Sequence, residues 1–148
     1  MKLIETRIEA AGVAPDELWD VLMDFPSYPD WNPMVVAIQG DAELGGRLET
    51  AIRMKNGRRM KFSPTIVEYE PGRLFGWLGK LGVRGLFDGL HRFEIAPSGS
   101  GAVFIHSEEF RGLLPPLLGR LLKDTHDGLV EMNEALVEEV SRRKARQV

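Results

Sequence analysis

Two histidines and a glutamate near the end of the sequence are the side chains best suited to chemistry. His91 lies in the alternating run Leu86–Ile95, and His106 and Glu108 share one face of the alternating run Ala102–Phe110. A Pro-Ser-Gly-Ser-Gly segment between the two runs predicts a chain reversal. In the resulting hairpin, His91 lies opposite His106 or Glu108 on the same face.

A carboxylate beside an imidazole supports two interpretations. In an apolar cavity, Glu108 would orient the ring of His91 and tune its proton affinity, as a general base requires. Such a base could remove a proton next to a carbonyl group, which is the step that an aldol-type cyclase needs. Alternatively, the two side chains satisfy each other's hydrogen bonds inside the protein and have no chemical role.

The sequence gives no ligand set for a metal or another cofactor, and we expect none. Of the three histidines, His126 lies on a predicted helix with no second histidine four residues away, and no His-Glu-x-x-His motif is present. The chain has no cysteine, which excludes disulfides and thiolate ligands. Gly79, Gly82 and Gly85 match no phosphate-binding or dinucleotide-binding pattern, and we expect them to make turns and bends.

The composition indicates an ordinary soluble protein. The 148 residues suit one domain. A net charge of −3 gives no electrostatic footprint for nucleic acid. No stretch of about 18 apolar residues and no signal peptide are present. We therefore expect a mature, cytoplasmic protein without stable membrane insertion, as a monomer or homodimer.

The element that must organise the fold is a helix over about Leu117–Val140. About 24 residues make a rod roughly 36 Å long, so its apolar stripe needs an equally long surface to pack on. We expect the preceding strands to supply it. The stripe recurs at steps of three and four residues and consists of Leu118, Leu122, Thr125, Leu129, Met132, Leu136 and Val140.

The segments before this helix alternate between strand and helix signals. A strand over Lys2–Ala11 is followed by a short helix that begins at Pro15. The connector Phe25–Pro33 contains three prolines and allows at most one further helical turn. Six antiparallel strands follow, at Met34–Gln39, Gly46–Met54, Met60–Tyr69, Arg73–Leu78, Leu86–Ile95 and Ala102–Phe110.

The order of elements indicates an α+β protein whose helices lie on one side of a curved antiparallel sheet. Asn56-Gly57 is the strongest hairpin signal, since both residues tolerate the positive φ of a type I′ turn.

Several motifs are spread over the chain. They are Pro15-x-x-x-Trp19-x-x-Leu22-x-Asp24-Phe25-Pro26, Tyr28-Pro29-Asp30-Trp31-Asn32-Pro33, Gly89-Leu90-His91-x-Phe93, Glu108-x-Phe110-x-Gly112-Leu113-Leu114 and Met132-Asn133-x-Ala135-Leu136. The first two resemble the N-terminal signature of the SRPBCC superfamily, also called START-like or Bet v 1-like. The others resemble its polyketide cyclase/dehydrase-like branch.

This resemblance implies a helix-grip fold, in which a seven-stranded antiparallel sheet curves around a long C-terminal helix, with two short helices after strand one. It also implies a cavity between the sheet and the long helix. The superfamily includes lipid carriers, plant hormone receptors, aromatic cyclases, dioxygenase subunits and chaperone activators. The fold alone therefore constrains the function little.

The implied cavity would be lined by aromatic, methionine and leucine side chains. Such residues are core in most domains, yet at a cavity mouth they form adaptable apolar walls. The candidates, in addition to His91 and Glu108, are Trp31, Met54, Met60, Phe62, Phe75, Trp77, Phe87, Phe93, Phe104, His106, Phe110, Leu118, Leu122, Leu129 and Met132, with Met34 in the same set. The stretches Gly79–Gly89 and Gly112–Gly119 are either gates over the cavity or irregular connections.

Two functions remain in view. We favour a module that binds a hydrophobic small molecule, such as a lipid, a polyketide or a polycyclic compound, with His91, His106 and Glu108 orienting it. The alternative is an aromatase/cyclase-type enzyme in which His91 or Glu108 transfers protons. A co-chaperone-like role is a third possibility, for which the sequence offers no dedicated surface.

Overall fold

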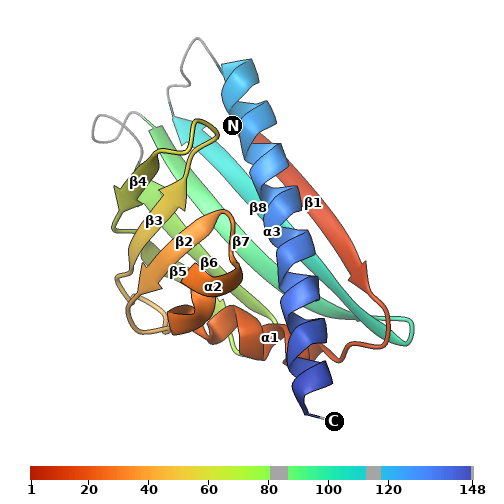
Figure 1. Ribbon diagram of the computed structural model, residues 1–148. Helices are drawn as coiled ribbons and strands as arrows, with labels where there is room; N and C mark the ends of the chain where they lie inside the picture. The colour runs from red at the N-terminus through yellow and green to blue at the C-terminus, as the bar shows by residue number, and fades with distance from the viewer. Residues whose placement is uncertain (81–86, 113–117, 148) are drawn as a thin grey trace.

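The computed structural model describes residues 1–80, 87–112 and 118–147. The chain alternates short helical elements and strands before it ends in one long helix (Figure 1). The elements are β1 (Lys2–Ala10), α1 (Pro15–Met23), the 3₁₀ turn η1 (Phe25–Ser27), α2 (Tyr28–Trp31), β2 (Val35–Gln39), β3 (Glu49–Arg53), β4 (Arg59–Phe62), β5 (Thr65–Glu70), β6 (Leu74–Lys80), β7 (Phe87–Ser98), β8 (Gly101–Gly112) and α3 (Leu118–Arg146).

The strands form two antiparallel sheets, and α3 lies across the larger one (Figure 1). The larger sheet has the order β1-β8-β7-β6-β5, and the smaller has the order β2-β3-β4. Backbone hydrogen bonds from Leu48 to Pro64 and from Ile66 to Gly46 tie the two sheets together. This arrangement confirms the predicted α+β class and the helix-grip fold.

The predicted count of seven strands is wrong, because the run Met60–Tyr69 forms two strands. β4 belongs to the small sheet and β5 to the large one, and the chain changes sheets at Ser63 and Pro64. A proline has no backbone N–H to donate to a ladder, so pairing is interrupted there. The alternation of side chains continues through the break, which is why the pattern alone did not show it.

The structure largely agrees with the short helices and the hairpin turn predicted before α3. The connector contains η1 and α2 in succession, so it holds slightly more helix than the single turn predicted. The hairpin at Asn56-Gly57 joins β3 to β4 as predicted. Its turn is not type I′, because only Gly57 has positive φ, at 84°. Leu86, predicted to begin the next strand, lies outside the described residues.

The apolar stripe of α3 is fully buried only toward its C-terminal end. Leu129, Met132, Leu136 and Val140 are buried, and the last three belong to the core cluster that includes aromatic residues of the sheet. Leu122 and Thr125 are only half-buried. The first turns of α3 therefore cover a space that core side chains do not fill.

The C-terminal end of α3 is anchored to α1 by charged side chains. Glu139 accepts hydrogen bonds from Arg142 at 2.9 Å and Arg143 at 3.1 Å, and Arg143 also pairs with Asp24 at 2.9 Å. Burial by itself raises the pKa of Glu139, but the two guanidinium groups outweigh it and the pKa is lowered.

We predict that Glu139→Gln lowers the free energy of unfolding by about 1 kcal/mol near neutral pH. Because the folded-state pKa is the lower one, this stabilisation is present above the unfolded pKa of about 4.3 and disappears as the pH falls through the folded value. Urea unfolding at about pH 7 and about pH 3 measures the difference. Glu138→Gln is the control, since Glu138 is exposed. An equal loss at both pH values would contradict the prediction.

Candidate functional site

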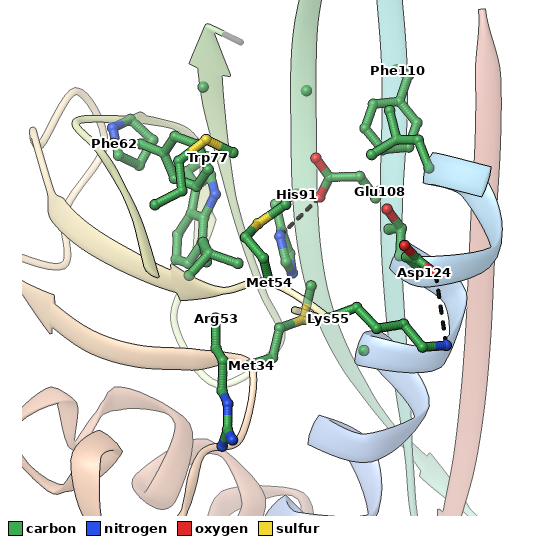
Figure 2. Close-up of a pocket in the computed structure, with 18 residues that line it drawn as sticks. Met34, Arg53, Met54, Lys55, Phe62, Trp77, His91, Glu108, Phe110 and Asp124 are labelled. Atoms are coloured by element: carbon green, nitrogen blue, oxygen red, sulfur yellow. Dashed lines mark ion pairs between the residues drawn. The ribbon is translucent and has the colours of Figure 1, made fainter. Parts of the chain in front are cut away.

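A cavity of about 160 Å³ lies between the first turns of α3, the β3–β4 hairpin and strands β6 to β8 (Figure 2). Most of its wall is apolar. The apolar residues are Met34, Ile52, Met54, Met60, Phe62, Pro64, Trp77, Phe110 and Leu121, the polar residues are Arg53, Lys55, His91, Glu108, Asp124 and Thr125, and the remaining wall is formed by Gly79, Gly89 and Gly128.

The cavity reaches the protein surface at the β3–β4 hairpin. Arg53, Lys55 and Met60 line it and are exposed. The Lys55 ammonium lies 3.6 Å from Asp124 and 2.9 Å from Asp127, so it links the hairpin loop to α3 across the rim (Figure 2). The hydrogen bond to Asp127 raises the pKa of Lys55.

His91 and Glu108 form the polar part of the inner wall. They are direct cross-strand partners in the β7–β8 ladder, which matches the second of the two predicted registers. Glu108 Oε2 lies 2.8 Å from His91 Nδ1, and both residues are buried (Figure 2). Despite this short distance, Oε2 makes no hydrogen bond among the described residues. It retains bonding capacity toward the cavity.

A chain of buried polar groups continues behind this pair. His91 Nε2 lies 2.5 Å from His106 Nε2, and His106 Nδ1 lies 2.8 Å from Asn133 Oδ1 on α3. Asn133 Nδ2 donates to Thr6 Oγ1 on β1 at 2.8 Å, and that hydroxyl donates to the His106 carbonyl oxygen at 3.0 Å. Burial, reinforced by the neighbouring His91, holds the pKa of His106 well below its usual value. His106 is therefore neutral.

Aromatic rings fix the orientation of His91. It stacks on Phe93 with ring centroids 4.5 Å apart, and the centroid of Trp77 lies 5.0 Å away on a tilted plane. Phe93 in turn stacks on Phe75 at 4.4 Å. The imidazole is thus held by rigid neighbours from β6 and β7, as a precisely aimed polar group requires.

The structure separates the predicted cavity residues into two groups. Met34, Met54, Met60, Phe62, Trp77 and Phe110 line the cavity together with His91 and Glu108. The others within the described side chains do not line it, and these are Trp31, Phe75, Phe93, Phe104, His106, Leu122, Leu129 and Met132. The side chains of Phe87 and Leu118, and most of the two predicted gate stretches, lie outside the described residues.

The residues of the second group were predicted wrongly because strand alternation identifies the inner face of the sheet. It does not show which part of that face the cavity occupies. The rest of the inner face is filled by the core cluster, to which Leu18, Phe25 and Tyr28 of the short helical elements contribute. Sequence reasoning missed Asn133 and Thr6 because neither stands out from ordinary polar residues. It also missed Leu121 and Gly128, although with Thr125 their spacing of four and three residues was a usable helical signal.

Two absences concern only the parts of the chain that the structure describes. In 1–80, 87–112 and 118–147, no group of three or more histidine and acidic side chains is placed to hold a metal ion. Over the same residues, no helix is long and apolar enough to cross a membrane.

The fold and the site define a helix-grip protein with a cavity between its sheet and its long helix. The model of the family described as polyketide cyclase/dehydrase and lipid transport matches residues 1–145, and the chain belongs to that family. The resemblance to the SRPBCC superfamily is thereby confirmed. Among proteins with curated functions, none matches this chain.

Solved structures share the fold at low sequence identity. A START superfamily protein from Mycobacterium smegmatis is 18% identical, with a TM-score of 0.76, over 95% of this chain and 97% of its own. A protein from Mesorhizobium loti is 16% identical, with a TM-score of 0.74, over 95% and 98%. The di-domain ARO/CYC StfQ from the steffimycin biosynthetic pathway is 16% identical, with a TM-score of 0.72, over 97% of this chain and 51% of its own.

We predict that Gly128→Ala raises the free energy of unfolding by about 0.5–1 kcal/mol, because glycine inside a helix is less stable than alanine. A Cβ at this position would meet only Met34, at 3.7 Å, which is an ordinary contact. Urea unfolding measures the change. Gly119→Ala, whose Cβ meets nothing within 4 Å, is the control for helix propensity. A loss of stability at Gly128 alone would show that the space beside it is filled.

Proposed function

We propose that this protein binds a hydrophobic small molecule in the cavity beneath α3, with the His91–Glu108 pair orienting a polar group of the ligand. The observation that carries the proposal is a buried carboxyl oxygen of Glu108 that makes no hydrogen bond among the described residues and lies at a mostly apolar wall. Leaving such a group unsatisfied costs about 1–3 kcal/mol, and a ligand that bonds to it removes that cost. Apolar walls with a few convergent polar groups are typical of small-molecule sites.

The dimensions of the cavity limit how the ligand is held. Its volume of about 160 Å³ is close to that of an apolar cavity of about 150 Å³ that binds benzene. The enclosed space therefore holds a part of the ligand about one ring in size. The rest of a lipid, polyketide or polycyclic compound extends past the exposed side chains of Met60 and Lys55 at the rim of the cavity.

We predict that a bulky apolar side chain at position 128 abolishes ligand binding. Gly128→Leu places an isobutyl group in the cavity, whereas Gly119→Leu adds the same group to an exposed part of the same helix. Native mass spectrometry of the protein from its host, followed by solvent extraction, would identify the class of bound compound. The adduct should be absent from Gly128→Leu and retained by Gly119→Leu. Equal retention by both variants would place the ligand outside this cavity.

A second function, an aromatase/cyclase-type enzyme, is favoured by one further observation. The polar pair at the cavity wall is joined to a buried relay of ionisable and amide groups, which suits proton transfer. One structural neighbour, StfQ, is an ARO/CYC protein.

Enolisation of a ketone probe tests the enzymatic function. With 1-phenylpropan-2-one in deuterated buffer, we predict that the protein accelerates deuterium uptake next to the carbonyl by at least roughly tenfold over Glu108→Gln. Proton NMR measures the uptake. The probe's affinity for the variant must stay within twofold for the comparison to report on catalysis. Equal rates for both proteins would remove the enzymatic function and leave ligand binding.

A further inference from the structure

The buried polar chain behind the cavity has a fixed hydrogen-bond direction. It starts at the His106 backbone carbonyl, which can only accept and receives the single hydroxyl proton of Thr6 at 3.0 Å. The Thr6 oxygen must then accept from Asn133, at 2.8 Å. This requirement orients the Asn133 amide with Nδ2 toward Thr6 and Oδ1 toward His106.

The same logic assigns the proton on each ring. Asn133 Oδ1 is an acceptor, so His106 Nδ1 must carry a proton, and the Leu129 carbonyl also favours a proton on this ring. Because burial keeps His106 neutral, its Nε2 is bare. The two Nε2 atoms lie 2.5 Å apart, where two N–H groups would clash and two lone pairs would repel each other. The proton between them therefore belongs to His91.

This assignment changes the role of the His91–Glu108 pair. His91 is already a complete neutral imidazole with its proton on Nε2, so its Nδ1 has no proton of its own to give to Glu108. A carboxylate oxygen and a bare ring nitrogen, 2.8 Å apart in a buried site, would face each other with two lone pairs. A proton taken up between them removes this repulsion.

We propose that the His91–Glu108 pair is net neutral at neutral pH, with one shared proton between Nδ1 and the carboxyl group, and that it acts on a ligand as a proton donor. The ligand class is a hydrophobic compound with a carbonyl or enolate oxygen, an assignment that rests on the proposed function. In the transfer, the pair's O–H or N–H bond breaks and an O–H bond forms on the ligand. The pair is left as neutral His91 and a Glu108 carboxylate, and it regains the proton when the ligand oxygen releases it.

The other ionisable groups at the cavity do not oppose this assignment. Lys55 is paired with Asp124 and Asp127 at the rim, so its charge is largely compensated. The guanidinium of Arg53 is directed away from Glu108 (Figure 2). Asp124 lines the same cavity, and a negative charge there favours the protonated pair. Thr6 and Asn133 are positioning residues, which act only through the tautomers that they impose.

Nitrogen-15 NMR of the full-length, ligand-free protein tests the proton assignment directly. Near neutral pH, we expect His106 to be protonated on Nδ1 only, and His91 on Nε2. We also expect either a protonated Glu108 carboxyl in the carbon-13 spectrum or a second proton on His91. The proposal is overturned if His106 carries its proton on Nε2, or if Glu108 is ionised beside a singly protonated His91.

An isosteric substitution tests which residue sets the direction of the buried hydrogen bonds. Thr6→Val removes the hydroxyl that orients Asn133, so the His106 ring should shift toward the Nε2 tautomer. Thr50→Val is the matched control, because Thr50 is also buried and its hydroxyl donates to the Phe62 carbonyl outside the chain. An unchanged His106 tautomer in Thr6→Val would overturn the role of Thr6. The spectrum of the unmodified protein tests the number of protons on the His91–Glu108 pair without any variant.

A pair of probes separates this inference from the proposed function. Acetophenone and ethylbenzene have similar size, but only acetophenone has an oxygen that accepts a proton or hydrogen bond. A donating pair should bind acetophenone about fivefold more tightly, as one net hydrogen bond gives. Equal affinities would overturn the donor role. Binding of neither probe would count against the proposed function, while the NMR result still decides the proton count.

Discussion

The division of α3 into a packed part and an unpacked part is the constraint on which the rest of the structure depends. Toward its C-terminus, Leu136 and Val140 are buried against the sheet and the short helical elements, and Arg143 anchors the helix to Asp24. Near its start, Leu121 and Thr125 face the cavity instead. The apolar side chains buried by the C-terminal turns stabilise the helix on the sheet. The first turns can therefore cover an apolar space without filling it.

Asn133 lies where these two parts of the helix meet. A buried amide is costly unless it is satisfied, and its bonds to Thr6 on β1 and His106 on β8 exist only when α3 sits at one height on the sheet. The same three side chains therefore fix the helix and assign the proton positions next to the cavity. Structural specificity and the chemistry of the site are supplied by a single set of hydrogen bonds.

The sequence predicted the features that follow from short-range periodicity. Alternation placed His91 opposite either His106 or Glu108, and the spacing of three and four residues gave the buried stripe of α3. Pro64 was not recognised as a change of sheet, since the alternation continues through it. The location of the cavity depends on which side chains fill the other end of the inner face, and that is a property of the packed chain. Asn133 belongs to the site through a contact with a residue 127 positions away.

The network also bears on how one cavity can serve either a carrier or an enzyme. A net-neutral pair can be buried at an apolar wall without an uncompensated charge, whereas an isolated carboxylate there would be expensive. The same neutral pair donates to a ligand oxygen in either function. In a carrier, that hydrogen bond is present in the resting complex. In an enzyme, it strengthens as the carbonyl gains negative charge, so the distinction depends on the reactivity of the ligand.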